Sequence, residues 1–121
     1  MLIEMKNRLP NYVRAHRRRA GLSQYEIATI LGYRDEGTVS RHELFRSVPP
    51  LLIALAYEII FREPVSELFA GLRDSVEEGI EKRIGELESR LLEQSGDGVA
   101  TAAPAVTHKL GWIRERRGTC R

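Results

Sequence analysis

Apolar residues recur at spacings of three and four along most of the chain, the period that puts side chains on one helix face. A first helix is predicted from near Pro10, a favourable first-turn residue, to Gly21. A second begins at Ser23, where Glu26 completes a capping box, and ends at Gly32. The predicted inward residues of these helices are Leu9, Val13, Ala20, Ile27, Ala28 and Leu31. No segment shows the alternation of a strand, so the predicted fold class is all-α.

Two further short helices follow. The third begins near Asp35, whose carboxylate can accept from backbone N–H groups two or three residues ahead. Val39 is its inward residue, with His42 or Glu43 next on that face. After a loop, Pro50 is expected to open a fourth helix. Its predicted inward residues are Leu52, Leu55, Ala56 and Ile59.

A long amphipathic pattern runs from Pro64 to about Glu93. Its apolar positions are Val65, Leu68, Phe69, Leu72, Val76, Ile80, Ile84, Leu87 and Leu91. Gly79 and Gly85 each weaken a helix by up to about 1 kcal/mol relative to alanine, so the helix could be continuous or could kink or break there. Residues 95–106 read as a linker of small residues, followed by a basic tail with one short helix around Trp112.

The charge distribution separates the chain into three parts. The 121 residues have a net charge of +2, but residues 1–62 carry +4, residues 63–95 carry −5 and residues 96–121 carry +3. An anionic partner is therefore expected on the first part. A single cysteine and the lack of a signal-peptide pattern or a membrane-length apolar run predict a cytoplasmic protein without membrane association.

The segment LSQYEIATILG, followed by TVSRHE, resembles the Xre/Cro-type, lambda-repressor-like helix-turn-helix regulators. The resemblance covers about Leu9 to Leu72 and implies a five-helix DNA-binding domain over residues 1–72. A long helix extension over 73–94 and a flexible linker with a basic tail over 95–121 would follow. From Gly32 to Val39 there are seven steps where the family pattern has six, so the YRDEG turn is one residue longer.

A recognition helix in the major groove reads base edges with its first turn and outward face. With Val39 inward, the predicted base-reading residues are Arg41, Ser40, Glu36, Gly37 and Thr38. Arg41 is the principal candidate, because its guanidinium can bond guanine O6 and N7 together. Three roles are open for the Glu36 carboxylate. It accepts a hydrogen bond from cytosine N4, it disfavours binding to non-cognate DNA sites, or its charge is neutralised by Arg34.

Phosphate contacts are predicted around this helix. The resemblance implies that Gln24 binds phosphate, and the helix N-terminus there favours an anion. The full predicted set is Gln24, Ser23, Arg14, Arg18, Arg34 and Arg46. The alternative is that the arginines form a solvated face. The resemblance also implies a structural ion pair between Arg17 and Glu43.

The apolar stripe beyond the first 70 residues is too extensive to stay exposed to solvent, so it should pack against another apolar surface. We expect a second copy to provide it, with dimerisation through Leu72, Val76, Ile80, Ile84, Leu87 and Leu91. The alternative is that the helix folds back on the first part of the chain, the helix-turn-helix domain, helped by a tail containing Trp112 and Ile113. His42 has two readings, a buried, hydrogen-bonded histidine or a pH-sensitive switch.

These features predict a sequence-specific DNA-binding transcriptional regulator that acts as a homodimer on a two-fold symmetric double-stranded site and lies on the bacterial nucleoid when bound. The alternative is a helix-turn-helix adaptor or antitoxin that works mainly through a protein partner. No catalytic set, metal-ligand spacing or cofactor motif is visible, so no enzymatic activity, metal or cofactor is predicted.

Overall fold

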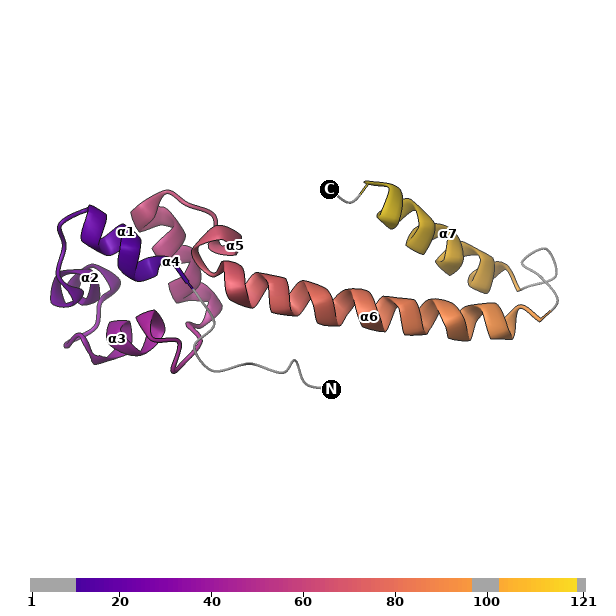
Figure 1. The fold of residues 1–121 in the computed structure, drawn as a ribbon, viewed down its shortest axis with the longest axis horizontal. Helices are drawn as coiled ribbons and strands as arrows, with labels where there is room; N and C mark the ends of the chain where they lie inside the picture. The colour runs from indigo at the N-terminus through magenta and orange to yellow at the C-terminus, as the bar shows by residue number, and fades with distance from the viewer. Residues whose placement is uncertain (1–10, 97–102, 120–121) are drawn as a thin grey trace. The chain divides into compact units, whose positions relative to one another are not determined.

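The computed structural model describes residues 11–96 and 103–119, and all regular secondary structure in these ranges is helical, as predicted (Figure 1). The helices are α1 Val13–Arg19, α2 Gln24–Leu31, α3 Gly37–Glu43, α4 Leu51–Phe61, α5 Val65–Leu68, α6 Ala70–Gln94 and α7 Pro104–Thr119. The chain divides into two compact units. We call residues 1–76 the N-terminal unit and residues 77–121 the C-terminal unit.

The ends of α2 follow the predicted signals. The Ser23 hydroxyl accepts from the Glu26 backbone N–H at 3.0 Å, and the Glu26 carboxylate accepts from the Ser23 N–H at 2.8 Å. Gly32 ends the helix with a φ of +92°. Such a left-handed conformation costs other residues roughly 1–2 kcal/mol, which explains the glycine.

Helix α1 is shorter than predicted. It begins at Val13, whose N–H donates to the Asn11 side chain at 3.1 Å. The predicted start at Pro10 and the inward residue Leu9 lie outside the described residues. Ala20 was predicted inward but is exposed, because the helix has already ended there.

The core of the N-terminal unit combines side chains from all five short helices and the residue after α5. Its buried members are Val13, Ile27, Ala28, Val39, Tyr57, Leu68 and Phe69. Leu31, Val65 and Leu72 pack against it while half-buried. The predicted inner faces of α2 and α3 are therefore confirmed, and the first residues of the long apolar pattern do belong to this core.

The predicted inner face of α4 is wrong. The residues expected to point inward were Leu52, Leu55, Ala56 and Ile59, yet Leu52 and Ile59 are 78% and 75% exposed. Ala54 and Tyr57 are buried instead. Because α4 is apolar around most of its circumference, the spacing alone does not select a face. Tyr57 decides it, since its hydroxyl bonds the buried His42 and its ring stacks on Phe61.

The long apolar pattern breaks at Phe69 rather than at a glycine. Val65 starts α5, and its N–H donates to the Glu58 carboxylate at 2.9 Å. Phe69 then leaves helical geometry, with φ −118° and ψ 51°, and is buried in the core. Helix α6 continues through Gly79 and Gly85, so neither glycine breaks it. The weak preference of a glycine against helix, up to about 1 kcal/mol, is too small to end a helix of 25 residues.

The C-terminal unit is a helical hairpin made of α7 and the second part of α6 (Figure 1). Leu91, Leu110 and Ile113 form its buried centre, and the half-buried residues packed against them are Ile84, Leu87 and Val106. Arg116 binds both carboxylate oxygens of Glu81, and Arg117 pairs with Glu88 at 2.8 Å. These bonds connect the basic α7 to the acidic α6.

The short helix predicted around Trp112 is longer than expected, because its first three residues lie in the predicted linker. It covers residues 104–119. They form a helix of four to five turns because Val106, Leu110 and Ile113 repeat at helical spacing and contact apolar residues of α6. The predicted linker therefore ends about three residues earlier than expected.

Two glycines of the C-terminal unit offer a matched test of these backbone conformations. A Cβ at either Gly85 or Gly96 would meet nothing within 4 Å, but only Gly96 has a positive φ, of +66°. We expect Gly85→Ala to raise the free energy of unfolding by about 0.5–1 kcal/mol, because alanine favours the helix. Gly96→Ala should lower it by roughly 1–2 kcal/mol. Urea unfolding followed by circular dichroism measures both, and changes of equal sign would contradict the assignment.

Candidate functional site

Helices α2 and α3 pack against each other and are joined by residues 32–36. On the inner side of α3, Val39 is fully buried and His42 is 2% exposed. On its outer side Arg41 is exposed, and Gly37, Thr38 and Ser40 are half-buried. The predicted division of α3 into an inward and an outward face therefore agrees with the structure.

The two acids before α3 have different environments. The Asp35 carboxylate accepts from the Gly37 N–H at 2.9 Å, two residues ahead as predicted, but the N-cap position of α3 is Glu36, one residue later than expected. Glu36 is exposed, directly precedes the helix and makes no side-chain capping bond. Only Glu36 therefore presents an uncommitted carboxylate at this end of α3.

Arg41 lies along the first turn of its own helix. Its guanidinium donates to the Thr38 hydroxyl at 3.1 Å. If residue 37 had a Cβ atom, that atom would lie 3.4 Å from a second guanidinium nitrogen of Arg41. Gly37 has no side chain and therefore leaves room for the guanidinium group. The structure thus brings Gly37, Thr38 and Arg41 together, and Glu36 immediately precedes them.

A buried ion pair connects α1 to α3. The Arg17 Nε lies 2.5 Å from Glu43 Oε2, and a second guanidinium nitrogen donates to Oε1 at 3.2 Å. The side chains of Arg17 and Glu43 are only 10% and 1% exposed. Arg17 also donates to the Leu22 carbonyl at 2.9 Å, in the loop before α2. The pair therefore fixes three segments relative to one another.

Gln24 belongs to the same network. Its side-chain N–H donates to Glu43 Oε1 at 3.0 Å. An amide group has a second N–H, so Gln24 keeps one donor beyond this bond. The predicted phosphate residue thus has a structural role that the sequence did not suggest. The Ser23 hydroxyl is likewise engaged in the capping box.

The four arginines predicted to bind phosphate are all exposed. Arg14 and Arg18 lie one turn apart on α1, Arg34 lies in the turn before α3, and Arg46 follows it. Within residues 11–96 and 103–119, none of these four side chains forms an ion pair with a carboxylate. Their charges therefore remain available to an anion.

His42 joins α3 to α4 inside the core. Its Nδ1 shares a hydrogen bond of 2.9 Å with the Tyr57 hydroxyl, and Asn11 donates to its backbone carbonyl at 3.1 Å. Burial, reinforced by the charge of Arg41, lowers the pKa of His42 below its ordinary value of 6.5. Burial also raises the pKa of Tyr57, with smaller effects of Glu43 and Tyr33. The reading of His42 as a buried, hydrogen-bonded residue agrees with this geometry.

The stripe predicted for dimerisation is largely used within the chain. Leu72 packs on the core of the N-terminal unit. Ile84, Leu87 and Leu91 pack against α7, and Leu91 is 3% exposed. The remaining two residues, Val76 and Ile80, are half-buried. The tail of the same chain thus covers Ile84, Leu87 and Leu91, three of the six predicted dimerisation residues.

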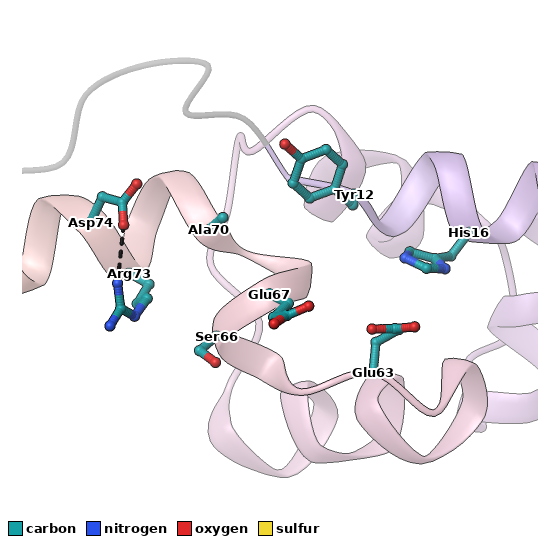
Figure 2. A pocket seen from close by; sticks show the side chains of 8 residues that line it. All are labelled: Tyr12, His16, Glu63, Ser66, Glu67, Ala70, Arg73 and Asp74. Carbon is teal, nitrogen blue, oxygen red and sulfur yellow. Dashed lines mark hydrogen bonds and ion pairs between the residues drawn. The ribbon is translucent and has the colours of Figure 1, made fainter. Parts of the chain in front are cut away.

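A surface cavity of about 560 Å³ lies elsewhere on the N-terminal unit. Its lining residues are Tyr12, His16, Glu63, Ser66, Glu67, Ala70, Arg73 and Asp74. Figure 2 shows the carboxylates of Glu63 and Glu67 turned toward the same space as the His16 ring. Arg73 bonds Asp74 at 3.3 Å. Acids outnumber bases here, so this cavity is unsuited to an anion and separate in character from α3.

Comparisons with protein-family models, with curated proteins and with solved structures find no match to this chain. In the part of the chain that the structure describes, no three His, Cys, Asp or Glu side chains are grouped so as to hold a metal ion. No helix among the described residues has the length and apolar character needed to cross a membrane.

Removing Arg17 should strongly destabilise the N-terminal unit. Arg17→Ala leaves the Glu43 carboxylate buried without its cation, which costs about 3–5 kcal/mol. Arg18→Ala, at an exposed neighbouring position, should change stability by less than about 0.5 kcal/mol. Urea unfolding at neutral pH measures both variants. Equal effects would show that the ion pair does not hold the helices together.

Stability should also fall as pH drops below neutral. Because the pKa of His42 is lowered in the folded state, the unfolded chain binds a proton near pH 6.5 before the folded chain does. The unfolding free energy should therefore decrease from pH 7.5 to pH 5.5. His42→Gln should remove part of this slope, whereas His108→Gln, at an exposed position on α7, should keep it. Parallel slopes for wild type and His42→Gln would contradict this assignment.

Proposed function

We propose that this protein is a sequence-specific DNA-binding transcriptional regulator of the Xre/Cro helix-turn-helix type. In this proposal α2 and α3 are the two helices of the motif, and α3 enters the major groove. The observation that carries it is the placement of Arg41 and Thr38 on the outer side of α3, while Val39 and Glu43 hold its other side in the core. A recognition helix needs this combination of a fixed inner face and a polar outer face.

Arg41 is the principal reader in this proposal. Its guanidinium carries five N–H donors, and one bond to Thr38 leaves enough of them for guanine O6 and N7. Gly37 keeps the adjacent surface low, so the helix can approach the bases closely. Thr38 and Ser40 contribute hydroxyl groups for bases or phosphates.

The exposed arginines supply the affinity that does not depend on sequence. Arg14, Arg18, Arg34 and Arg46 can each neutralise a phosphate and release counterions. Gln24 can donate its remaining side-chain N–H to a phosphate. Its bond to Glu43 fixes the direction of that N–H. Ser23 contributes mainly by capping α2, whose N-terminus has the partial positive charge that attracts phosphate.

The exposed Glu36 is compatible with this role. Within the major groove a carboxylate can accept a hydrogen bond from the cytosine N4 amino group. The DNA phosphates have no such donor to offer it. Asp35 is engaged with the Gly37 N–H, so it contributes little repulsion. We propose that Glu36 selects cytosine near the base read by Arg41.

The main alternative is an adaptor or antitoxin that works through a protein partner. The observation that favours it is the apolar surface that both units leave exposed, including Leu52 on α4 and Trp112 on α7. Such surface suits protein contacts. The exposed Arg41 on the outer side of α3 favours DNA instead, and the following experiment separates the two.

Arg41→Ala and Arg14→Ala should have different effects on DNA binding. A genomic-fragment selection first identifies a cognate duplex. Arg41→Ala should then weaken cognate binding by about 1–3 kcal/mol while leaving non-specific binding nearly unchanged. Arg14→Ala should weaken both about equally and reduce the salt dependence by about one phosphate contact. Equal loss on both duplexes for Arg41→Ala would remove it as a reader, and no DNA binding together with a co-purifying partner would favour the adaptor.

A further inference from the structure

Asn11 connects the start of α1 to the end of α3. Its side-chain NH₂ group donates to the His42 carbonyl at 3.1 Å and, over a longer distance of 3.5 Å, to the Glu43 carbonyl. Its side-chain carbonyl accepts from the Val13 N–H at 3.1 Å. His42 and Glu43 are the last two residues of α3, and Val13 is the first residue of α1. One half-buried side chain therefore binds backbone groups at the ends of two helices.

The bond from Asn11 differs from the other bonds at the end of α3. The last carbonyl groups of a helix have no N–H partner within the helix. The segment directly after α3 supplies some of the missing donors, for example the Phe45 N–H to the His42 carbonyl at 3.1 Å. Such bonds join neighbouring residues, so they close the helix without fixing where it lies. Asn11 lies 31 positions before His42, so its bond relates α3 to the start of α1.

The residue after Asn11 is also bonded to another helix. The Tyr12 N–H donates to the Leu68 carbonyl at 2.7 Å, at the end of α5. Helix α1 begins at the next residue, where the Val13 side chain is fully buried. The backbone around Asn11 is therefore held on its C-terminal side, and its amide group is a fixed point from which α3 can be placed.

We propose that Asn11 is a positioning residue for α3, which sets the place of the reading side chains without touching DNA. Helix α3 has only seven residues, about two turns, so a contact at one end affects its whole length. Arg41 directly precedes His42, whose carbonyl Asn11 binds. Hydrogen-bonding side chains must be held to within about 0.5 Å of the productive geometry, which requires such supporting bonds. The step from the placement of α3 to base reading rests on the proposed function.

The role of Asn11 differs from that of the ion pair at Glu43. Arg17 and Gln24 bind the Glu43 carboxylate, which is joined to the main chain through several rotatable bonds. The main chain of α3 can therefore shift while these side-chain bonds are kept. A carbonyl oxygen belongs to the main chain itself, so the bond from Asn11 restricts the helix directly.

This position needs a side chain that both donates and accepts. A short amide group provides both functions, whereas an ionised carboxylate of the same shape only accepts. Asn11→Asp would keep the acceptor for the Val13 N–H, and its charge would suit the N-terminus of α1. It would lose the donor to α3 and turn an oxygen toward the His42 carbonyl. This substitution therefore removes the link between the helices while the start of α1 keeps its bond.

Amide hydrogen exchange of the full chain, followed by NMR without DNA, tests the positioning. Asn11→Asp should speed exchange of the α3 amides by about 10-fold relative to the α2 amides, because α3 opens locally. Ala15→Glu makes the same change of charge at an exposed residue of α1 and should leave this ratio unchanged. Circular dichroism confirms that each variant is folded. Exchange that is unchanged, or that rises equally in α2 and α3, would overturn the proposal.

DNA binding then tests the consequence for reading. On the duplex found by genomic-fragment selection, Asn11→Asp should lower the ratio of cognate to non-specific affinity by about 10-fold, within the range of one bidentate arginine contact. Ala15→Glu should weaken both affinities by a similar factor and keep their ratio, because it changes only the charge. An unchanged ratio for Asn11→Asp would overturn its role in reading. A wild type that binds no DNA would refute the proposed function, and the exchange measurement would still decide whether Asn11 positions α3.

Discussion

The N-terminal unit depends on one buried carboxylate. Glu43 is the last residue of α3 and its side chain is 1% exposed, so its charge must be satisfied inside the protein. Arg17 from α1 and Gln24 from α2 both donate to it. Because these donors come from two other helices, the carboxylate fixes the position of α3 from its C-terminal end. Hydrophobic packing alone would leave such a short helix free to rotate about its axis, whereas directional bonds do not.

The neighbouring residue extends this control to α4. His42 bonds Tyr57, and the Tyr57 ring then stacks on Phe61 with centroids 6.3 Å apart. Tyr57 must therefore face the core, and the rotation of α4 about its axis is set. A consequence of this polar contact is that four large apolar side chains on the opposite side of α4 are left exposed. The same bond that orders the interior thus creates the surface available to a partner.

Sequence reasoning succeeded where local chemistry decides the structure. The capping box at Ser23, the glycine end of α2 and the bond from the Gly37 N–H to Asp35 depend on residues a few positions apart, so their spacing is visible in the sequence. It failed where the outcome depends on tertiary contacts. The face of α4 depends on a bond between residues 15 positions apart, and the position of α7 depends on partners about 20 positions or more away. The resemblance implied the Arg17–Glu43 pair, but no sequence pattern indicated that Gln24 would join it.

The separation between a rigid inner network and an exposed outer side has a consequence for α3. Arg41 makes one weakly constrained bond to Thr38, on the surface, while the residues directly after it are bonded in the interior. Its backbone is therefore positioned by the core, but its guanidinium remains free to exchange an intramolecular hydroxyl for a stronger pair of acceptors. In the proposed function, a reading residue held in this way would lose little conformational freedom of the main chain on binding, so more of the contact energy would be available for discrimination between bases.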